Sequence, residues 1–521
     1  MSFAKTSSAQ TIGLGAKIID VEIDLSKGLH SFTIVGLPDK GVEESRDRVS
    51  ASIKNSGFTS PKSLNQKVVV SLAPADIKKE GPIFDVAISL AYLLASEEVQ
   101  FDSKKILFLG ELSLDGNLRR INGVLPIVAE AKTRGFLEVF LPKDNAKEAA
   151  LVSDIKIYGA NNLKEIIEHL NTKKIQTKQK ENIVLKKIEQ QPQTEIILED
   201  DELLIDFSEI KGQETAKRGL EIAAAGGHNI AMYGPPGTGK TMLAKAFAHI
   251  LPTLSFEEIL EITSIHSVAG VLKKDIITKS PVRSPHHTAS YVSIVGGGTI
   301  PKPGEITLAH RGVLFLDEFP EFDRKVIETL REPLEENEIS ISRSRGTVTF
   351  PANFILIAAM NPCPCGNFGS KTKECVCKPT DLLRYQRKIS GPIIDRIDMW
   401  VEVSQINYEK LGEKDTDKKE TAQIRGRVIK ARELQKERFF KANRKIKTNS
   451  EMEAKDINKI ADLENSAKEI LNTSAKKLDL SARAYHRIIK LGRTIADLDG
   501  SKTINSSHIL EALQYRPKRN S

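Results

Sequence analysis

The residues Asn229-Ile-Ala-Met-Tyr-Gly-Pro-Pro-Gly-Thr-Gly-Lys-Thr241 set the architecture of the middle of the chain. The apolar run 230–233 predicts a short buried strand, and a helical pattern follows over 242–250. Between them, residues 234–241 match the phosphate-binding pattern G-x-x-x-x-G-K-[ST]. A strand, a glycine loop and a helix provide the context that this pattern requires, because loop N–H groups and the helix N-terminus together attract phosphate.

The loop residues have separate expected roles. Lys240 would reach the β- and γ-phosphates, and Thr241 would supply a hydroxyl to Mg²⁺. A chance glycine-rich turn is the alternative, and the complete pattern in this context makes it the weaker interpretation. We therefore predict that a nucleoside triphosphate binds at Gly234, Pro235, Pro236, Gly237, Thr238, Gly239, Lys240 and Thr241.

The composition limits the class of protein. A chain of 521 residues predicts two to four domains, and its 40% hydrophobic content is enough to bury a sizeable core. The net charge of +8, from 77 basic and 69 acidic residues, permits a nucleic-acid partner without requiring one. No apolar run approaches the roughly 18 residues of a membrane span, and no signal-peptide pattern opens the chain. We expect a cytoplasmic protein without a membrane partner.

A second apolar run, at 313–316, predicts a buried strand that ends in two carboxylates. Asp317 would hold the Mg²⁺ shell, and Glu318 would polarise an attacking water. A surface turn after a core strand is the alternative. The position of the two carboxylates downstream of a phosphate-binding loop favours a role for them in ATP hydrolysis. A third apolar run, at 355–360, ends at Asn361.

The first 170 residues have the pattern of an α/β domain without a phosphate-binding loop. Strand signals occur at 21–25, 31–35, 68–72, 106–109 and 139–141, and helical spacing occurs at 42–56 and 84–95.

Three segments of this region, Phe32-Thr-Ile-Val-Gly-Leu-Pro-Asp39, Leu72-Ala-Pro-Ala-Asp76 and Lys79-Glu-Gly-Pro82, resemble the N-terminal domain of the YifB/ComM family of magnesium-chelatase-like ATPases. The resemblance implies the fold of the Lon protease domain. In this chain, Ile83 and Leu125 occupy the positions of the Lon serine and lysine. Since neither side chain can attack a carbonyl, we expect a non-proteolytic domain.

The resemblance also implies the division of the chain. Residues 1–170 would form the inactive Lon-protease-like (ChlI-type) α/β domain, and the polar residues 171–206 a solvated linker. Residues 207–410 would form an AAA+ ATPase core of α/β class, and residues 411–521 a helical lid of the magnesium-chelatase C-terminal type. In the lid we expect a long helix at 422–440 and a helix capped by Ser481.

Further site residues follow from the resemblance to AAA+ ATPases. Ile210 and Gly212 would lie near the adenine of ATP, and Asn361 would be the sensor-1 residue that orients the water. A buried capping asparagine is the alternative for Asn361.

Arg396 would be an arginine finger that reaches the nucleotide of a neighbouring subunit, and Arg483 would reach the γ-phosphate from the lid. An arginine in a plain ion pair is the alternative. Arg384 and Arg387 compete for the finger role, and Arg487 is the substitute for Arg483.

Two insertions in the core are candidates for contact with DNA. The first, Arg283-Ser-Pro-His-His-Thr-Ala-Ser290, matches the family, and we interpret His286 and His287 as loop or DNA-contact residues rather than metal ligands. The second, at 338–350, predicts a β-hairpin with a basic tip, where Arg343 and Arg345 would contact phosphates. An ordinary solvated tip is the alternative.

All four cysteines of the chain lie in one short segment. They form two C-x-C pairs, Cys363 with Cys365 and Cys375 with Cys377. Four thiolates suit tetrahedral Zn²⁺, although C-x-C is tighter than the common C-x₂-C spacing. Two disulfides, free thiols or an iron–sulfur cluster are the alternatives.

The expected protein is an ATP- and Mg²⁺-dependent AAA+ ATPase, with zinc at the cysteines, that assembles as a homo-hexamer. The family resemblance implies a helicase acting on single-stranded or branched DNA, with branch migration during natural transformation as the expected process. The alternatives are a magnesium-chelatase-like ATPase that remodels a protein or metal-chelating partner, and a non-enzymatic DNA-binding or scaffold module. Lys240, Asp317 and Glu318 argue against the non-enzymatic module.

Overall fold

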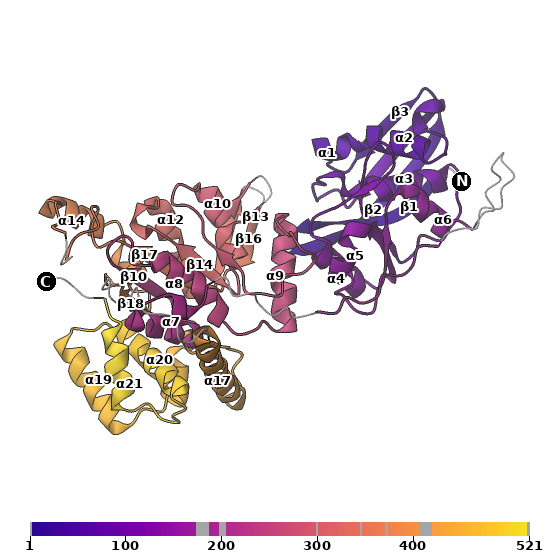
Figure 1. The fold of residues 1–521 in the computed structure, drawn as a ribbon. Helices are drawn as coiled ribbons and strands as arrows, with labels where there is room; N and C mark the ends of the chain where they lie inside the picture. The colour runs from indigo at the N-terminus through magenta and orange to yellow at the C-terminus, as the bar shows by residue number, and fades with distance from the viewer. Residues whose placement is uncertain are drawn as a thin grey trace. The chain divides into compact units, whose positions relative to one another are not determined.

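A computed structural model describes residues 3–172, 187–196, 205–298, 301–343, 346–369, 373–405 and 419–517. The chain divides into two compact units (Figure 1). The first unit comprises Met1–Ile197 and Ile259–Ile277, and the second comprises Leu198–Glu258 and Thr278–Ser521. The chain therefore passes between the units three times.

The first unit is built on a mixed sheet with the strand order β3-β4-β2-β1-β5-β8-β9. The pair β1–β2 is antiparallel, whereas β5, β8 and β9 run parallel to one another. The strands are β1 (Phe3–Ile12), β2 (Gly15–Lys27), β3 (Ser31–Val35), β4 (Gln66–Ala73), β5 (Ile106–Phe108), β8 (Glu138–Pro142) and β9 (Lys156–Ala160).

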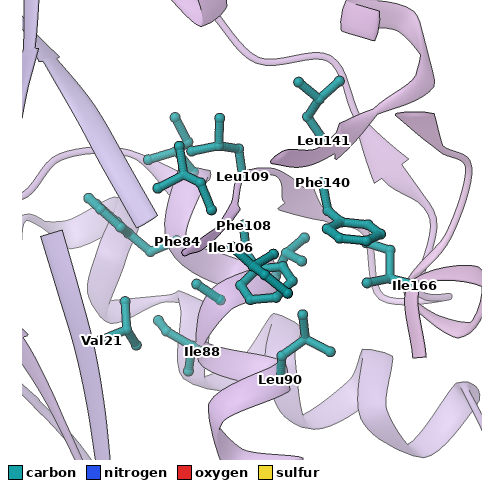
Figure 2. Close-up of a cluster of buried hydrophobic side chains, with 14 of the residues drawn as sticks. Val21, Phe84, Ile88, Leu90, Ile106, Phe108, Leu109, Phe140, Leu141 and Ile166 are labelled. Carbon is teal, nitrogen blue, oxygen red and sulfur yellow. The ribbon is translucent and has the colours of Figure 1, made fainter. Parts of the chain in front are cut away.

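Helices α2 (Ser45–Asn55), α3 (Asp85–Ala95) and α4 (Val124–Thr133) belong to the same unit. Nearly every side chain of α3 is buried, which its apolar sequence explains. Figure 2 shows part of the core, where the rings of Phe108 and Phe140 stack with centroids 5.7 Å apart. The predicted α/β class of this region is thereby confirmed. Ile83 and Leu125, which the resemblance is expected to place at the Lon dyad, are both buried apolar residues.

Helix α9 (Phe256–Ala269) packs largely with the first unit, although its sequence lies within the predicted ATPase core. The N–H of Gly123 donates to the carbonyl of Ser267 at 3.2 Å and to its hydroxyl at 2.9 Å. The Ser267 hydroxyl in turn donates to Glu148 at 2.5 Å. Burial raises the pKa of Glu148. Its carboxylate accepts from the hydroxyl of Ser267 and from the N–H of Leu125. Helix α9 is therefore tied into the first unit by buried hydrogen bonds.

Part of the predicted linker also belongs to the first unit. The N–H of Gln191 donates to the carbonyl of Ile157 at 2.8 Å, and the N–H of Thr194 donates to that of Ala150 at 3.1 Å. This part of 171–206 is bound rather than free, while residues 173–186 and 197–204 lie outside the described residues.

The second unit contains a sheet in which every adjacent pair of strands is parallel, with the order β11-β14-β17-β10-β18. Its strands are β10 (Ile230–Tyr233), β11 (Val282–Arg283), β14 (Val313–Leu316), β17 (Ile355–Met360) and β18 (Met399–Glu402). Because parallel strands all end on the same edge of a sheet, the residues that follow β10, β11, β14 and β17 meet there.

Helices α7 (Glu214–Gly226) and α8 (Lys240–Phe247) also belong to this α/β core. The helical region that follows the core contains α17 (Glu420–Lys441), α18 (Ala454–Ile460), α19 (Asn465–Lys477), α20 (Ala482–Leu498) and α21 (Ser506–Gln514). Ser481 caps α20 as predicted, since its side chain accepts from the N–H of Ala484. None of the described helices is long and apolar enough to cross a membrane.

The predicted hairpin is formed by β15 (Glu338–Arg343) and β16 (Gly346–Pro351), which pair in register from Glu338 with Pro351 to Arg343 with Gly346. Arg345 lies outside the described residues, and only the backbone of Arg343 is described.

Candidate functional site

The phosphate-binding loop joins β10 to α8 at the carboxyl edge of the parallel sheet. Gly237 and Gly239 have φ values of 78° and 89°, in the left-handed region that favours glycine. Helix α8 begins at Lys240, directly after Gly239. The segment therefore has the predicted order of strand, loop and helix. The N-terminus of the helix is directed at the loop.

Lys240 lies inside this loop. Its ammonium donates to the carbonyls of Gly234 at 2.7 Å and Pro235 at 2.8 Å. A third hydrogen bond, at 3.3 Å, goes to the side-chain oxygen of Asn361. Burial lowers the pKa of Lys240, while the nearby Asp317 opposes this shift. The predicted phosphate-binding lysine and the predicted sensor-1 residue are thus in direct contact.

The two predicted Mg²⁺ ligands are also in contact. The hydroxyl of Thr241 donates to Oδ2 of Asp317 at 2.9 Å. The other carboxylate oxygen of Asp317 accepts from the N–H of Glu318, also at 2.9 Å. Hydroxyl and carboxylate oxygens are the protein ligands that suit Mg²⁺ beside a nucleotide phosphate, so this pair fits the ion.

Glu318 has a strained backbone and an unpredicted partner. Its φ of 51° lies in the left-handed region, which a residue with a long side chain rarely adopts. Its Oε2 lies 3.0 Å from Nδ1 of His287. Sequence reasoning did not connect these residues. No pattern in the sequence connects them, because the adjacency of β11, which precedes His287, and β14, which precedes Glu318, appears only in the folded sheet.

The segment predicted to lie near the adenine approaches the phosphate-binding loop. Ile210 is buried and Gly212 has a φ of 64°. Gln213, which sequence reasoning missed, donates from Nε2 to the carbonyls of Ser404 at 2.7 Å and Thr238 at 3.3 Å. This side chain therefore links the loop to the segment that follows β18.

The two predicted catalytic arginines lie together. Arg396 pairs with one carboxylate oxygen of Glu335, and Arg483 pairs with the other at 2.9 Å. Arg396 also donates to the carbonyl of Pro392 at 2.9 Å. The described contacts of Arg396 and Arg483 are with this group, and not with the cluster around Lys240.

The alternative arginines have other surroundings. Arg487 donates to the carbonyl of Ile397 at 3.0 Å and lies 3.4 Å from Asp398, so it ties α20 to the segment before β18. Arg384 and Arg387 line a cavity of about 590 Å³ beside Phe322.

Comparison with known proteins covers nearly the whole chain. Family models match at residues 21–145 (subunit ChlI of Mg-chelatase), 206–411 (magnesium chelatase, subunit ChlI) and 418–516 (magnesium chelatase, subunit ChlI C-terminal). The chain is 41% identical to "Competence protein ComM" of Haemophilus influenzae, over 99% of this chain and 98% of that protein. It is 40% identical to "Uncharacterized protein YifB" of Escherichia coli, over 99% of this chain and 97% of that protein.

The chain belongs to the YifB/ComM family of magnesium-chelatase-like ATPases. A more distant similarity, 29% identity to the "Magnesium-chelatase 38 kDa subunit" of Rhodobacter capsulatus, covers 30% of this chain and 50% of that protein. The predicted family and α/β class are confirmed.

This YifB/ComM chain also brings its four cysteines together. Their Sγ atoms all lie within 4.8 Å of one another, and no disulfide joins them. The Sγ of Cys363 lies 3.3 Å from that of Cys365 and 3.8 Å from that of Cys375. A tetrahedron of thiolates around zinc with ~2.3 Å bonds has sulfur–sulfur edges of about 3.8 Å. The cluster therefore fits a zinc ion.

The cysteine cluster adjoins the phosphate-binding loop. A Cβ on Gly366, the residue after Cys365, would lie only 2.6 Å from Cδ of Pro236. Gly366 has a φ of 80° as well, so both its backbone and its close packing favour glycine. A metal held by the cysteines would thus fix a loop that touches the nucleotide-binding residues.

Proposed function

We propose that this protein is a hexameric ring motor that couples ATP hydrolysis to movement along DNA, and that it promotes branch migration during natural transformation. The observation that carries the proposal is the cluster of Lys240, Thr241, Asp317, Glu318 and Asn361. The similarity over nearly the full chain to a protein named "Competence protein" supports DNA as the substrate.

Within one subunit, Lys240 would exchange its two loop carbonyls for phosphate oxygens. Thr241 and Asp317 would hold Mg²⁺, whose charge would stabilise the transferring phosphoryl group. Glu318 would accept the proton of the attacking water, and Asn361, already in contact with Lys240, would orient that water.

The arginines would complete the site of a neighbouring subunit. Because Arg483 shares Glu335 with Arg396, we infer that both arginines act on the same neighbour's nucleotide. The sequence predicts that Arg483 reaches a γ-phosphate from the lid, and we assign that phosphate to the neighbouring subunit. In the ring, phosphate would replace Glu335 as their anionic partner.

The cysteine cluster would hold one structural zinc, and Arg343 and Arg345 at the tip of the β15–β16 hairpin would contact DNA phosphates. The pairing of β15 with β16, which runs to Arg343 opposite Gly346, supports a hairpin at this place in the chain. Contacts to phosphates carry no base information, so binding through this tip would not depend on sequence.

The first test measures ATP turnover by the full chain with no DNA, with single-stranded DNA and with branched DNA. We expect DNA to stimulate turnover, because ATP hydrolysis would be coupled to movement along the DNA. Turnover that is equal in all three conditions would contradict the DNA-directed function, although it would leave the ATPase assignment intact.

The second test is the double variant Arg343→Ala with Arg345→Ala. The slope of log affinity for DNA against log salt should flatten by about 1.4 to 1.8, since two phosphate contacts are lost. The matched control is Lys476→Ala with Lys477→Ala at the end of α19, which removes the same charge elsewhere. Equal slopes for both double variants would show that the hairpin does not bind DNA.

An ATPase that remodels a protein or metal-chelating partner is the second candidate. The three magnesium-chelatase family models favour it. This function predicts stimulation by a protein partner and none by DNA, so the first test separates the candidates.

A further inference from the structure

The last turn of α17 carries an aromatic ring that the hydrophobic core does not bury. Phe439 and Phe440 are adjacent in the sequence, but Phe439 is 1% exposed and belongs to the core, whereas Phe440 is 84% exposed. Among the phenylalanines in the described part of the chain, Phe440 is the most exposed. A single exposed ring needs no explanation by itself, so the groups around it decide its role.

Basic side chains dominate the sequence around this ring. The segment Lys436-Glu-Arg-Phe-Phe-Lys-Ala-Asn-Arg-Lys-Ile-Lys447 contains six basic residues and one acidic residue. Three of the basic residues are paired with carboxylates of other segments, namely Arg438 with Asp497, Arg444 with Asp456 and Lys447 with Glu258. These three cations are therefore accounted for by the fold.

The three remaining lysines, Lys436, Lys441 and Lys445, are all exposed. Lys436 lies one helical turn before Phe440 on the same face, and Lys441 follows the ring directly. Lys441 makes a solvent-exposed pair of 3.7 Å with Glu437, and neither Lys436 nor Lys445 has a carboxylate partner among the residues that the structure describes. Cations stabilise the C-terminus of a helix, which explains positive charge here but not the exposed ring. The surface thus combines an aromatic face with uncompensated positive charge.

This end of α17 lies at the edge of the parallel sheet opposite to the nucleotide site. Gln435 is fully buried, and its side chain donates to the carbonyl of Ala225 at 2.9 Å and accepts from the N–H of Asn449 at 3.0 Å. Ala225 shortly precedes β10 and therefore lies at the amino edge, whereas Lys240 and Asn361 follow β10 and β17 at the carboxyl edge. A ligand bound at the end of α17 would leave the nucleotide-binding residues free.

We propose that Phe440 is a stacking platform for a base of single-stranded DNA, and that Lys436, Lys441 and Lys445 bind the adjoining phosphates. Every base has a face that stacks on an aromatic ring, and lysines bind phosphates without reading the sequence. An acidic protein segment would satisfy the lysines without using the ring, and a lipid surface would require a larger apolar area. The identity of the ligand as DNA rests on the proposed function, and this contact is additional to the one proposed for the β15–β16 tip.

The test measures the binding of a labelled oligothymidylate to the full chain by fluorescence anisotropy. Phe440→Leu should raise the Kd about 10-fold, which corresponds to ~1.4 kcal/mol, because leucine keeps an apolar surface and loses the aromatic face. Phe440→Trp should bind at least as tightly as the parent. Both variants should bind fully paired DNA with the affinity of the parent, because its bases are already stacked on one another.

The lysines have a different expected signature. Lys436→Ala with Lys445→Ala should flatten the slope of log affinity for the oligothymidylate against log salt by about 1.4, since two phosphate contacts are lost. Phe440→Leu should lower the affinity at every salt concentration without changing this slope, because stacking releases no counterions. The control is Phe3→Leu, which removes a ring that is 53% exposed on β1 and should bind as the parent does.

Basal ATP turnover and the KM for ATP should not change in Phe440→Leu, because the ring lies at the opposite edge of the sheet. The proposal is overturned if Phe440→Leu binds the oligothymidylate as the parent does, or if Phe440→Trp is weakened equally. A changed molar mass of the assembly in Phe440→Leu, measured by light scattering, would also overturn it, because the ring would then be a contact between copies. If no DNA stimulates ATP turnover, the proposed function fails, and the oligothymidylate comparison still decides the role of Phe440.

Discussion

Lys79 in the first unit and Lys240 in the second are both buried lysines, and burial lowers the pKa of both. Each donates to a backbone carbonyl of its own loop, Lys79 to Pro74 and Lys240 to Gly234. Their surroundings differ. Lys240 also contacts Asn361, whereas Lys79 follows β4, a strand that pairs antiparallel with β2 and parallel with β3.

A desolvated lysine therefore does not by itself mark a nucleotide-binding or catalytic site. In the second unit, parallel strands end on one edge and deliver Thr241, Asp317, Glu318 and Asn361 around the lysine. In the first unit, the residues expected at the dyad positions, Ile83 and Leu125, are apolar and cannot perform proton transfer. The convergence of strand ends, rather than burial, distinguishes the two regions.

The largest expected effect breaks the nucleotide site itself. Lys240→Met should raise the Kd for ATP about 100-fold, because a charge-assisted contact to phosphate is lost, and turnover should become undetectable. Lys79→Met is the matched control, with the parent affinity for ATP. Equilibrium binding of a fluorescent ATP analogue measures both. Loss of binding in both variants would contradict the distinction drawn between the two regions.

The next effect concerns Arg396 and Arg483, the two arginines that pair with Glu335. Arg396→Ala and Arg483→Ala should each lower kcat about 10³-fold while ATP still binds, since transition-state charge loses its partner. Mixing either variant with Lys240→Met subunits should restore part of the activity. Lys477→Ala is the control and should behave as the parent. If Arg483→Ala is not complemented, this arginine acts within its own subunit.

Glu318→Gln should lower kcat by about 10²-fold or more and retain ATP binding, because the phosphate and metal ligands survive while the base is lost. Single-turnover hydrolysis and ATP binding, measured on the same preparation, separate the two steps. A variant with the parent's kcat would refute the assignment of Glu318 as the base.

A smaller effect is expected at the cysteine cluster. Metal analysis should find about one zinc per chain, and Cys365→Ser should lower both the zinc content and the Tm, the latter by about 5 °C. Val376→Ser, a change at a residue that is 82% exposed in the same loop, is the control and should keep the metal. Iron in place of zinc, or no metal in the parent, would contradict the zinc centre.

The smallest effect is expected for Lys79→Met on unfolding. Because burial lowers the pKa of Lys79 below its ordinary value of 10.5, the cost of burying the charge is fully present below the folded pKa, falls as the pH rises through it, and is gone above 10.5. Removing the charge offsets the lost hydrogen bond, so the free energy of unfolding should change by about 1 kcal/mol or less. Denaturant unfolding at pH 7 tests this, and a large loss would mean that Lys79 organises its loop.

Short apolar runs made much of the ATPase core predictable. Strand β10 coincides with the expected 230–233, and β14 coincides with the expected 313–316, because the apolar residues there are bounded by glycine or polar residues. Once those strands are placed, the residues after them are placed too. This is why Lys240, Asp317 and Asn361 were identifiable from the sequence alone.

Strand β1 was not predictable from its composition. Its sequence Phe-Ala-Lys-Thr-Ser-Ser-Ala-Gln-Thr-Ile alternates weakly, and yet Thr6 and Ser8 are buried. The Thr6 hydroxyl donates to the carbonyl of Ala87 on α3 at 3.0 Å, so a partner distant in sequence makes its burial acceptable.

The sequence did not predict the contact of Glu318 with His287 or the packing of α9 in the first unit, for the same reason. His287 follows a strand of only two residues, too short to give a periodic signal. The place of Ser267 depends on Gly123 and Glu148, which lie more than 100 residues away in the chain. Local patterns carry no information about such pairings.

The tie between α9 and the first unit limits how this protein can be divided in the laboratory. A fragment that begins near residue 205, chosen from the sequence boundary of the ATPase, would retain Ser267 without the Gly123 and Glu148 that bind it. A fragment that stops near residue 197 would leave the buried Glu148 without its serine donor. The two units are thus compact but are not two consecutive segments of the chain. Transfer of the first unit into a relative would require moving Ile259–Ile277 with it.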